Sequence, residues 1–364
     1  MLYFYRIILI LLALNTVTLQ NSFAKDKIDN IVVFGDSMSD IGNLNKEIHF
    51  IYVPPRDGYW RGHFSNGPVW IEYVASLFNN KDYVNQKPIG ATYLLKYSDK
   101  VGLSVNKVSK VKEPFGILED DAVGGALATS NFSVLGGLYH IPSLPTQVDN
   151  YFQASPERVD AEIQHSLYVL EIGGNDYLHG SGNTNDIILM IQTSLDKLIN
   201  RGAKYFLIPN LPELSDSFEA KLNPSQLKFR KVQTEQYNKM LKALVYKYRK
   251  KYPNIIFVYA DVHSYFNQII KNSGVIGKYA QTKDLVFSNK DYCNKSGFDI
   301  SGIVKSAVLC ETEEQRKTTV FWDKVHPSTA VHCIIGKDVF SLLQLDIYHK
   351  KIRSNYNGCI DSLL

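Results

Sequence analysis

Ser37 lies in a short turn that follows an apolar segment. The run Ile-Val-Val-Phe at 31–34 is followed at once by Gly35 and Asp36, which predicts a buried strand leading into a turn. A helix that starts just beyond such a serine aims its backbone N–H groups at an anion near the hydroxyl. Ser37 therefore has either the position of a nucleophile or the simpler role of a cap. Ser39 stands where a G-x-S-x-G elbow has its second glycine, so the α/β-hydrolase motif is not met.

An aspartate and a histidine near the end of the chain could complete this chemistry. Asp323 and His326 are three residues apart and stand just before Pro327, a residue that suits the first turn of a helix. A serine hydroxyl becomes a good nucleophile when a neutral imidazole takes its proton and an acceptor orients that imidazole. His326 and Asp323 are the residue types for these roles. Taken alone, the pair could equally be a helix cap with an incidental histidine. The occurrence of Asp323 and His326 together with the Ser37 turn favours catalysis.

Two glycine-containing turns could stabilise the negative charge created by such an attack. Asn175 follows a glycine pair after a predicted strand and offers a neutral amide donor to an oxyanion. Gly124 or Gly125 could present a backbone N–H to the same charge. Both segments also have ordinary turn composition, and Asp176 is expected to brace the Asn175 loop. Asp36 and Asp40 are expected to organise the serine turn, and His332 is expected to pack. No partner motif accompanies His63 or His263.

Alternating strands and helices would position these motifs. Strands are predicted at 31–34, 167–172, 205–208 and 255–259, and helices at 187–199, 224–249, 262–270 and 327–343. Repeated strand–helix units predict a parallel sheet covered on both faces. Such sheets place their sites at the carboxyl ends of the strands, which is where the Ser37 and Asn175 turns fall.

Two long segments interrupt the alternation. Residues 44–120 are predicted to be largely irregular, with one helix at 68–78, and residues 280–318 form a second surface excursion. Long loops in compact domains are usually functional or mobile. We therefore expect a single domain over residues 25–364, with insertions at about 44–120 and 280–318.

The N-terminus predicts export. Arg6 precedes an apolar run at 7–14, a more polar stretch follows, and Ser-Phe-Ala closes the segment at 22–24, a pattern typical of signal peptidase sites. The apolar run is shorter than the roughly 20 residues that a membrane span needs. Residues 1–24 are therefore predicted to be a signal peptide, and the protein is expected to be periplasmic or secreted. An N-terminal membrane anchor is the alternative.

Charge and cysteine content narrow the function classes further. The formal net charge of +4 is too mild to indicate a nucleic-acid partner and is compatible with an anionic membrane surface. Four cysteines allow three disulfide pairings, and export makes disulfides plausible. Because short loops close most readily, we expect Cys293–Cys310 and Cys333–Cys359. The absence of a C-x-x-C pair argues against a metal site.

The motifs together resemble a known family. Gly35-Asp36-Ser37, Gly125, Gly173-x-Asn175-Asp176 and Asp323-x-x-His326 occur in this order over nearly the whole mature chain. This set is similar to the GDSL family of lipases and esterases, also called SGNH hydrolases. The stretch from Tyr59 to Trp70 resembles the branch that contains bacterial secreted phospholipases, lysophospholipases and glycerophospholipid–cholesterol acyltransferases.

The resemblance implies a fold and a set of roles. The fold would be a flavodoxin-like three-layer α/β/α sandwich with a central parallel sheet. Ser37 would be the nucleophile, His326 the base and Asp323 its orienter, without a metal or an organic cofactor. The oxyanion would be held by the backbone N–H groups of Ser37 and Gly125 and by the side chain of Asn175.

The sequence departs from the family pattern at two places. Met38 replaces the usual leucine, which is a nearly isosteric change. Asp120 and Asp121 stand before the glycine block, where two acids that pointed inward would oppose an oxyanion. We therefore expect both side chains to point outward.

The expected activity is hydrolysis of phospholipid or lysophospholipid acyl esters at a membrane surface, with acyl transfer to a sterol or another alcohol as a variant of the same chemistry. A carbohydrate O-acetyl esterase would use the same triad, and a non-catalytic secreted lipid-binding protein would need only the fold. The Cys293–Cys310 loop could be a lid that an activating protease cuts, or a simple surface staple.

Overall fold

The computed structural model describes most of the chain downstream of the predicted signal peptide. The described residues are 28–48, 52–55, 58–79, 117–134, 137, 139–179, 182–271, 291–294, 308–354, 356 and 359. The predicted signal peptide and the interior of the Cys293–Cys310 loop lie outside these ranges.

A five-stranded parallel sheet forms the centre of the molecule, with strand order β2-β1-β5-β6-β7. The strands are β1 Asn30–Gly35, β2 Ile117–Asp120, β5 Ser166–Glu171, β6 Tyr205–Pro209 and β7 Ile256–Ala260. Four of them confirm the predicted strands. All five run in one direction, so their carboxyl ends meet at one edge of the sheet.

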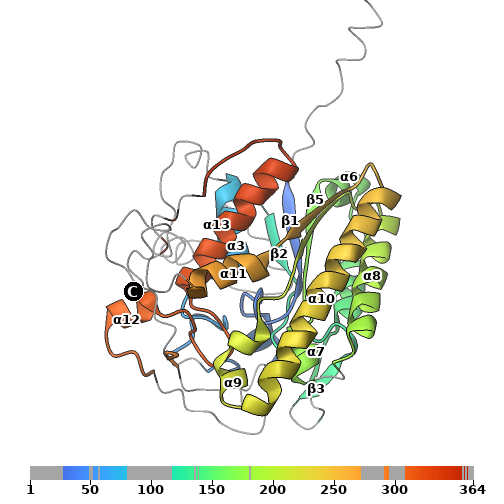
Figure 1. Ribbon diagram of the computed structural model, residues 1–364. Helices are drawn as coiled ribbons and strands as arrows, with labels where there is room; N and C mark the ends of the chain where they lie inside the picture. Colours follow the sequence, from blue (N-terminus) through green and yellow to red (C-terminus); the bar gives the residue numbers. More distant parts are fainter. Residues whose placement is uncertain are drawn as a thin grey trace, which may run out of the picture.

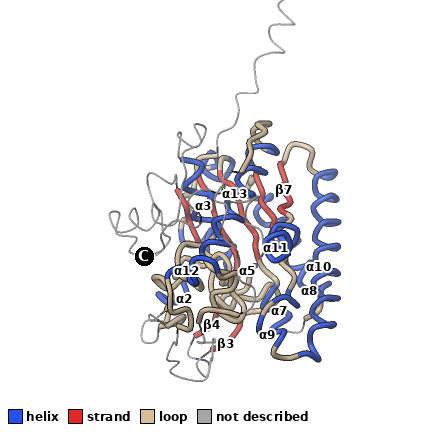
Figure 2. The backbone as a smooth tube through the Cα atoms, turned by 60° about the vertical axis from the view of Figure 1, so that its left-hand side comes forward, coloured by secondary structure: helices blue, strands red, loops and turns tan. Residues whose placement is uncertain are grey.

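Strand residues alternate between two hydrophobic cores. In β1, Ile31 and Val33 pack on one face, whereas Val32 and Phe34 pack on the other. The first face is covered by α3 Trp70–Asn79, α11 Val262–Lys271 and α13 Thr329–Asp346, and the second by α5 Leu144–Ala154, α8 Thr184–Asn200 and α10 Pro224–Lys251. Figures 1 and 2 show these helices on opposite sides of the sheet. The predicted three-layer α/β/α fold is confirmed.

Shorter elements connect the layers. They are α2 Asn43–Glu47, α6 Asp160–Gln164, α7 Gly174–Leu178, the 3-10 helix η3 Leu214–Asp216, α9 Phe218–Lys221, α12 Glu313–Thr318 and a hairpin of β3 Phe132–Val134 with β4 Tyr139–Ile141. Within the described ranges, no helix has both the length and the apolar character that crossing a bilayer requires.

Strand β2 corrects the predicted insertion at 44–120, because it lies inside that interval and pairs with β1. Its sequence, Ile-Leu-Glu-Asp, ends in two acids and so lacks the apolar run that marks the other strands. Glu119 is nevertheless buried, because the guanidinium of Arg158 forms an ion pair with its carboxylate. A paired charge can enter the interior in this way, but neither partner reveals the pair from its own sequence surroundings.

Helices α3 and α13 pack against each other, although they lie far apart in the sequence. Gly336 packs directly on α3, where an added Cβ would come within 2.6 Å of the Trp70 carbonyl oxygen. The Trp70 N–H donates to Nδ1 of His332 at 3.2 Å, and the hydroxyls of Tyr73 and Thr329 are 2.8 Å apart. These contacts fix the start of α13, and with it the turn that carries His326.

Two disulfides confirm the predicted pairings. Cys333 in α13 is bonded to Cys359, with a Cα–Cα distance of 5.4 Å, and Cys293 is bonded to Cys310 at 4.9 Å. The first ties the C-terminal tail to a helix of the core. The second lies beside the segment that leads into α13.

Candidate active site

The side chains of Ser37, His326 and Asp323 form a continuous hydrogen-bonded chain. The Ser37 Oγ lies 2.8 Å from Nε2 of His326, and the other ring nitrogen, Nδ1, lies 2.8 Å from Oδ2 of Asp323. Ser37 follows the carboxyl end of β1, whereas the other two precede α13. All three are less than a tenth exposed. The fold thus brings together residues 289 positions apart in the sequence.

Asp323 is held by a ring of donors. Its Oδ1 accepts the backbone N–H groups of Val325 and His326 at 2.8 and 2.7 Å, and its Oδ2 accepts the hydroxyl of Tyr59 at 2.7 Å. Burial alone would raise the pKa of Asp323, but the His326 ring and N–H and the Tyr59 hydroxyl together lower that pKa below its ordinary value. The carboxylate is therefore charged and oriented toward the imidazole.

An aromatic ring covers the imidazole. The Phe64 ring lies against His326 with a centroid distance of 5.0 Å and an interplanar angle of 39°. Phe64 also fits against the Gly124 turn so closely that a Cβ there would come within 2.2 Å of its ring. The imidazole is thus fixed by packing on one face and by hydrogen bonds at both nitrogens.

Hydrogen bonds and close packing at Gly35 hold the start of the Ser37 turn in place. Gln147 of α5 donates to the Gly35 carbonyl and accepts the Gly35 N–H, both at 2.9 Å. Gly35 has no room for a side chain, because a Cβ would lie 2.4 Å from the carbonyl oxygen of Glu171. Asp36 accepts the Met38 N–H through Oδ1 at 3.1 Å. The predicted role of Asp36 in the turn agrees with this bond.

Asp40 connects the serine turn to the glycine turn. Its Oδ1 accepts the N–H of Gly42 at 2.7 Å, and its Oδ2 accepts the N–H groups of Leu44 at 3.2 Å and Gly124 at 2.7 Å. The Gly124 N–H is therefore occupied. Gly125 has a φ of +81°, and among the described residues no acceptor takes its N–H or that of Ser37.

Asn175 lies in α7, which begins directly after β5. One proton of its side-chain amide is donated to the Ala126 carbonyl at 3.2 Å, which joins the Asn175 loop to the glycine turn. Asp176 strengthens this junction by accepting the N–H of Ala128 at 2.8 Å and the hydroxyl of Thr129 at 2.7 Å. The expectation that Asp176 braces the loop agrees with these bonds.

Two buried acids lie beneath the serine turn. Glu171 at the end of β5 accepts the Ser39 hydroxyl at 2.9 Å, and that hydroxyl in turn accepts the Trp70 indole N–H at 3.1 Å. Burial raises the pKa of Glu171 to about 7. Burial and the neighbouring Glu171 carboxyl raise the pKa of Asp36 well above its ordinary value. Both shifts favour the protonated, uncharged form of the carboxyl.

The expectation that Asp120 and Asp121 point outward is wrong for Asp120, which is 3% exposed. Its Oδ1 accepts the Ala122 N–H at 2.8 Å, so the carboxyl caps the end of β2 from inside. Burial and the nearby Asp40 raise the pKa of Asp120 well above its ordinary value, and burial followed by Glu119 raises the pKa of Asp121 to about 7. Protonation allows these acids to lie near the glycine turn without a full negative charge.

Residues 31–339 match the family model described as GDSL-like lipase/acylhydrolase. The chain belongs to this family. The family match thus extends over nearly all of the folded domain, from β1 into α13.

The relatives of this GDSL protein are esterases, lipases and acyltransferases of low identity. The phosphatidylcholine-sterol acyltransferase of Aeromonas hydrophila is 23% identical, with 92% of this chain and 96% of that protein covered. The thermolabile hemolysin of Vibrio parahaemolyticus is 25% identical, with 86% of this chain and 63% of that protein covered. A GDSL esterase/lipase of Arabidopsis thaliana is 24% identical over 85% and 81%. These relatives support a general acyl-ester hydrolase or acyltransferase.

Among solved structures, an acetylxylan esterase of Geobacillus stearothermophilus has a TM-score of 0.39 and 12% identity, covering 90% of this chain and 98% of that one. A lipolytic G-D-S-L family protein of Veillonella parvula has a TM-score of 0.38 and 13% identity, covering 84% and 93%. Similarity at this level carries no information about the substrate of this GDSL protein.

The remaining histidines have structural partners. His332 is fully buried, and burial followed by the neighbouring His326 lowers the pKa of His332 to about 3; its neutral ring accepts the Trp70 N–H. His63 lies 3.1 Å from Glu72, which also accepts the Val69 N–H at the start of α3. The backbone N–H of His263 donates to the side chain of Asn210.

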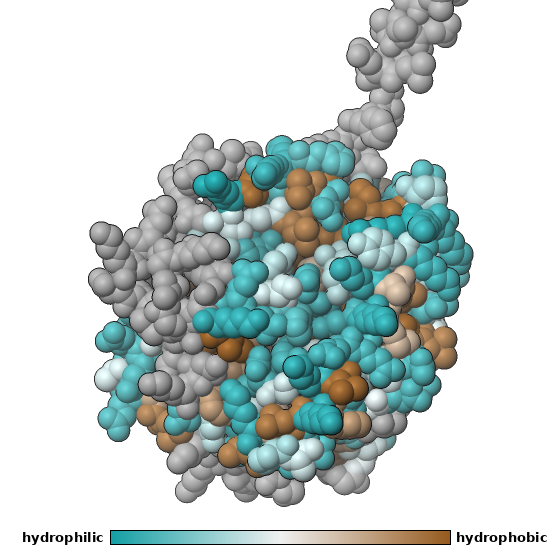
Figure 3. Space-filling model, viewed as in Figure 1, coloured by the Kyte–Doolittle hydropathy of each residue, from teal (hydrophilic) through white to brown (hydrophobic). Residues whose placement is uncertain are grey.

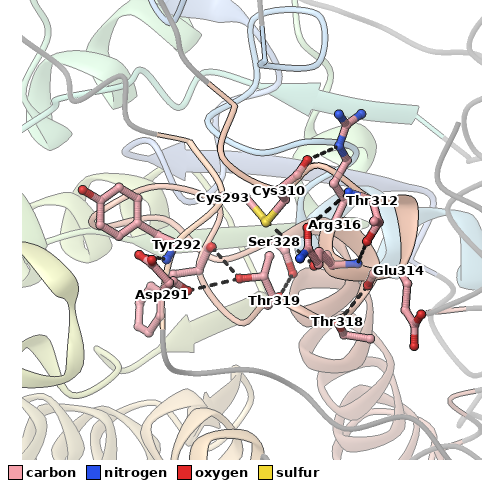
Figure 4. Close-up of a disulfide and its surroundings, with 12 residues drawn as sticks. Asp291, Tyr292, Cys293, Cys310, Thr312, Glu314, Arg316, Thr318, Thr319 and Ser328 are labelled. Carbon is pink, nitrogen blue, oxygen red and sulfur yellow. Dashed lines mark hydrogen bonds between the residues drawn. A yellow bond between two sulfur atoms is a disulfide. The ribbon is translucent and has the colours of Figure 1, made fainter.

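The Cys293–Cys310 disulfide lies near Thr319 and Ser328, which precede and follow the Asp323 turn in the sequence (Figure 4). The neighbouring Asn294 N–H donates to the Trp322 carbonyl at 2.7 Å, and Tyr59, Cys293 and Trp322 share one apolar cluster. In Figure 4, Thr319 and Ser328 connect the same region to the start of α13. The disulfide therefore supports the segment that carries Asp323 and His326.

Several residues of the site were not predicted from the sequence. Tyr59, Phe64, Gln147 and Glu171 contact the three central side chains or their turns. Glu171 was detectable in principle, because an acid at the end of an apolar strand is unusual. Tyr59 and Phe64 lie in the stretch that resembles a branch of the family, but that resemblance gave them no role, and Gln147 carries no local signal.

Proposed function

We propose that this protein is a secreted serine esterase that hydrolyses acyl esters of phospholipids and lysophospholipids through an acyl-Ser37 intermediate. The observation that carries the proposal is the unbroken hydrogen-bonded chain from Ser37 through His326 to Asp323. A serine, an imidazole and a carboxylate in this order form the arrangement that activates a serine hydroxyl.

The reaction begins with attack of the Ser37 Oγ on the ester carbonyl carbon. The hydroxyl proton passes to Nε2 of His326, while Nδ1–H of the same ring donates to the charged Asp323. The tetrahedral intermediate collapses, and His326 returns the proton to the departing alcohol. Water, activated by the same ring, then attacks acyl-Ser37 and releases the fatty acid. Neither step requires a metal or an organic cofactor.

Three donors are proposed for the oxyanion: the N–H groups of Ser37 and Gly125 and the side-chain amide of Asn175. Gly125 is preferred to Gly124, because the Gly124 N–H is already donated to Asp40. One amide proton of Asn175 is used by Ala126, which leaves the other for substrate. Each donor is expected to lower the barrier by about 2.7–4 kcal/mol.

The lipid preference rests on the relatives and on the aromatic residues around the triad. The Aeromonas relative, named as a phosphatidylcholine-sterol acyltransferase, aligns over almost its whole length. Phe64 and Tyr59 border the triad directly, which makes its surroundings apolar. A sterol or another alcohol that replaced water in the second step would give acyl transfer by the same residues.

Export is proposed from two features. The N-terminal segment has the order of a signal peptide. Both disulfides are typical of proteins that fold under oxidising conditions. We expect the mature enzyme to act in the periplasm or outside the cell.

The test is release of fatty acid from lysophospholipid by the purified mature protein, measured beside its Ser37→Ala variant. We expect release by the wild type and a loss of at least about a thousandfold in the variant. Acetylated xylan and a short-chain soluble ester complete the panel. Activity confined to acetylated glycans would replace the lipid assignment with a carbohydrate esterase, and inactivity on every ester would leave a lipid-binding protein.

A further inference from the structure

Helix α10 carries an unusual concentration of positive charge. Its 28 residues include nine lysines or arginines and one acid, Glu235, which gives a net charge of +8. The whole chain has a net charge of +4, so everything outside this helix sums to −4. The net positive charge of the protein is therefore localised on α10, although the net charge of the whole chain is small.

The charge points outward. All seven lysines of α10 are exposed, whereas Arg230 is buried against Glu219 and Arg249 is half-buried and donates to the Phe257 carbonyl. The exposed lysines are Lys228, Lys231, Lys239, Lys242, Lys247, Lys250 and Lys251. At 1.5 Å per residue the helix is roughly 42 Å long, and Figures 1 and 2 show α10 running along one side of the molecule. The exposed lysines are therefore distributed along that side.

Large apolar side chains are interspersed with these lysines. Phe229 is 56% exposed, Val232 52% and Tyr246 52%. Lys228, Val232, Lys239 and Tyr246 are 4, 7 and 7 residues apart, which is about one or two helical turns, so they lie on one stripe of the helix. In Figure 3 the surface over α10 is mostly hydrophilic with separate apolar groups within it. Lysines around exposed aromatic and aliphatic residues are the composition of helices that lie on anionic bilayers.

We propose that the exposed face of α10 is a docking surface for anionic lipid bilayers. Lysine ammonium groups would meet lipid phosphates, and Phe229, Val232 and Tyr246 would enter the headgroup region. A second copy of the chain is disfavoured as the occupant, because two faces of net +8 repel each other. A purely polyanionic partner is disfavoured as well, because it would offer no apolar environment to the exposed apolar side chains.

The buried face of the same helix supports the candidate active site. The Tyr237 hydroxyl donates to the Ile172 carbonyl at 2.6 Å, and its ring lies so close to Gly173 that a Cβ there would come within 2.8 Å. These residues lead directly into the Asn175 loop. A bilayer bound along α10 would therefore hold the candidate active site at a fixed position beside the lipid. This part of the proposal rests on the proposed lipid substrate.

The experiment measures binding of the inactive Ser37→Ala mature protein to vesicles by sedimentation. Vesicles of phosphatidylcholine alone are compared with vesicles that also contain phosphatidylglycerol, at low and high salt. We expect binding only to the anionic vesicles, weakened by salt. Equal binding to both vesicle types, or no binding to either, would overturn the proposal.

Two matched triple variants locate the surface. Lys228→Gln/Lys239→Gln/Lys242→Gln removes three charges from α10, and Lys350→Gln/Lys351→Gln/Arg353→Gln removes three exposed charges from the C-terminal tail. We expect the first to weaken binding at least about tenfold and the second less than about twofold. Equal losses would show that net charge alone matters.

A third variant separates a bilayer from a simple polyanion. Phe229→Ser/Val232→Ser should weaken vesicle binding at least about threefold while retention on a heparin column stays unchanged. No effect on vesicle binding would make the face a polyanion site and overturn the lipid assignment. The active α10 lysine variant should hydrolyse a soluble ester at the wild-type rate, so failure of the proposed function and failure of docking remain distinguishable.

Discussion

Two groups of buried carboxyls flank the serine, and their charges differ. Asp323 and Glu171 are both less than a tenth exposed. Asp323 faces an imidazole, two backbone N–H groups and a hydroxyl, which lower the pKa of Asp323 despite its burial. Burial raises the pKa of Glu171 to about 7, and Glu171 in turn raises the pKa of its neighbour Asp36. Burial raises the pKa of both carboxyls, and the difference lies in what opposes it: His326, its N–H and the Tyr59 hydroxyl at Asp323, but only the Ser39 hydroxyl at Glu171.

The largest expected effect separates the two groups by activity. Asp323→Asn removes the charge that orients and stabilises the imidazole, and we expect kcat/KM for a soluble ester to fall about ten-thousand-fold. Asp36→Asn replaces a carboxyl whose raised pKa favours the uncharged form by an isosteric neutral amide, so the loss of kcat/KM should stay below about tenfold. Comparable losses in the two variants would contradict the distinction.

The second prediction concerns stability and pH. The pKa of Glu171 rises from 4.5 to about 7 on folding, so between these values the folded state holds a proton that the unfolded state has lost. The stabilisation is complete below pH 4.5 and is lost as the pH rises through 7, at a cost on the order of 3 kcal/mol. Glu171→Gln cannot ionise and should retain this free energy.

Urea unfolding at pH 4.5, 6 and 8 measures this difference directly. The free energy of unfolding of the wild type should decline more steeply with pH than that of Glu171→Gln. Parallel curves would mean that Glu171 is not the group that titrates beneath the serine.

The smallest effect tests a single donor to Asp323. Tyr59→Phe removes a hydroxyl that lies 2.7 Å from Oδ2, and a hydrogen bond to a charged group contributes about 1.5–3 kcal/mol. We expect kcat to fall about tenfold with little change in KM. Tyr151→Phe, which removes a buried hydroxyl that lies 3.4 Å from the Tyr168 hydroxyl, is the matched control and should leave kcat unchanged.

Most of the fold and the centre of the site could be predicted from local patterns. Apolar runs of four to six residues identified β1, β5, β6 and β7. The structure brings together the polar turns that follow β1 and β5, since a Cβ at Gly174 would lie 3.9 Å from Oδ2 of Asp36. Strand ends and turns are set by neighbouring residues, so a single sequence reveals them. The two disulfides followed from loop length in the same way.

The contacts that could not be predicted join residues far apart in the chain. Tyr59 and Asp323 are 264 positions apart, and Gln147 reaches Gly35 across 112. Strand β2 and the burial of Asp120 depend on Arg158 and on protonation inside the fold. Such pairings become visible only when the layers are assembled.

The packing of α13 on α3 has a consequence for the time at which the protein becomes complete. His326 precedes α13, and α13 is fixed by Gly336, His332 and Thr329 against residues near the start of the domain. Ser37 is made long before its hydrogen-bond partner His326, which follows 289 positions later in the chain. During synthesis Ser37 therefore remains without this hydrogen-bond partner until α13 packs on α3.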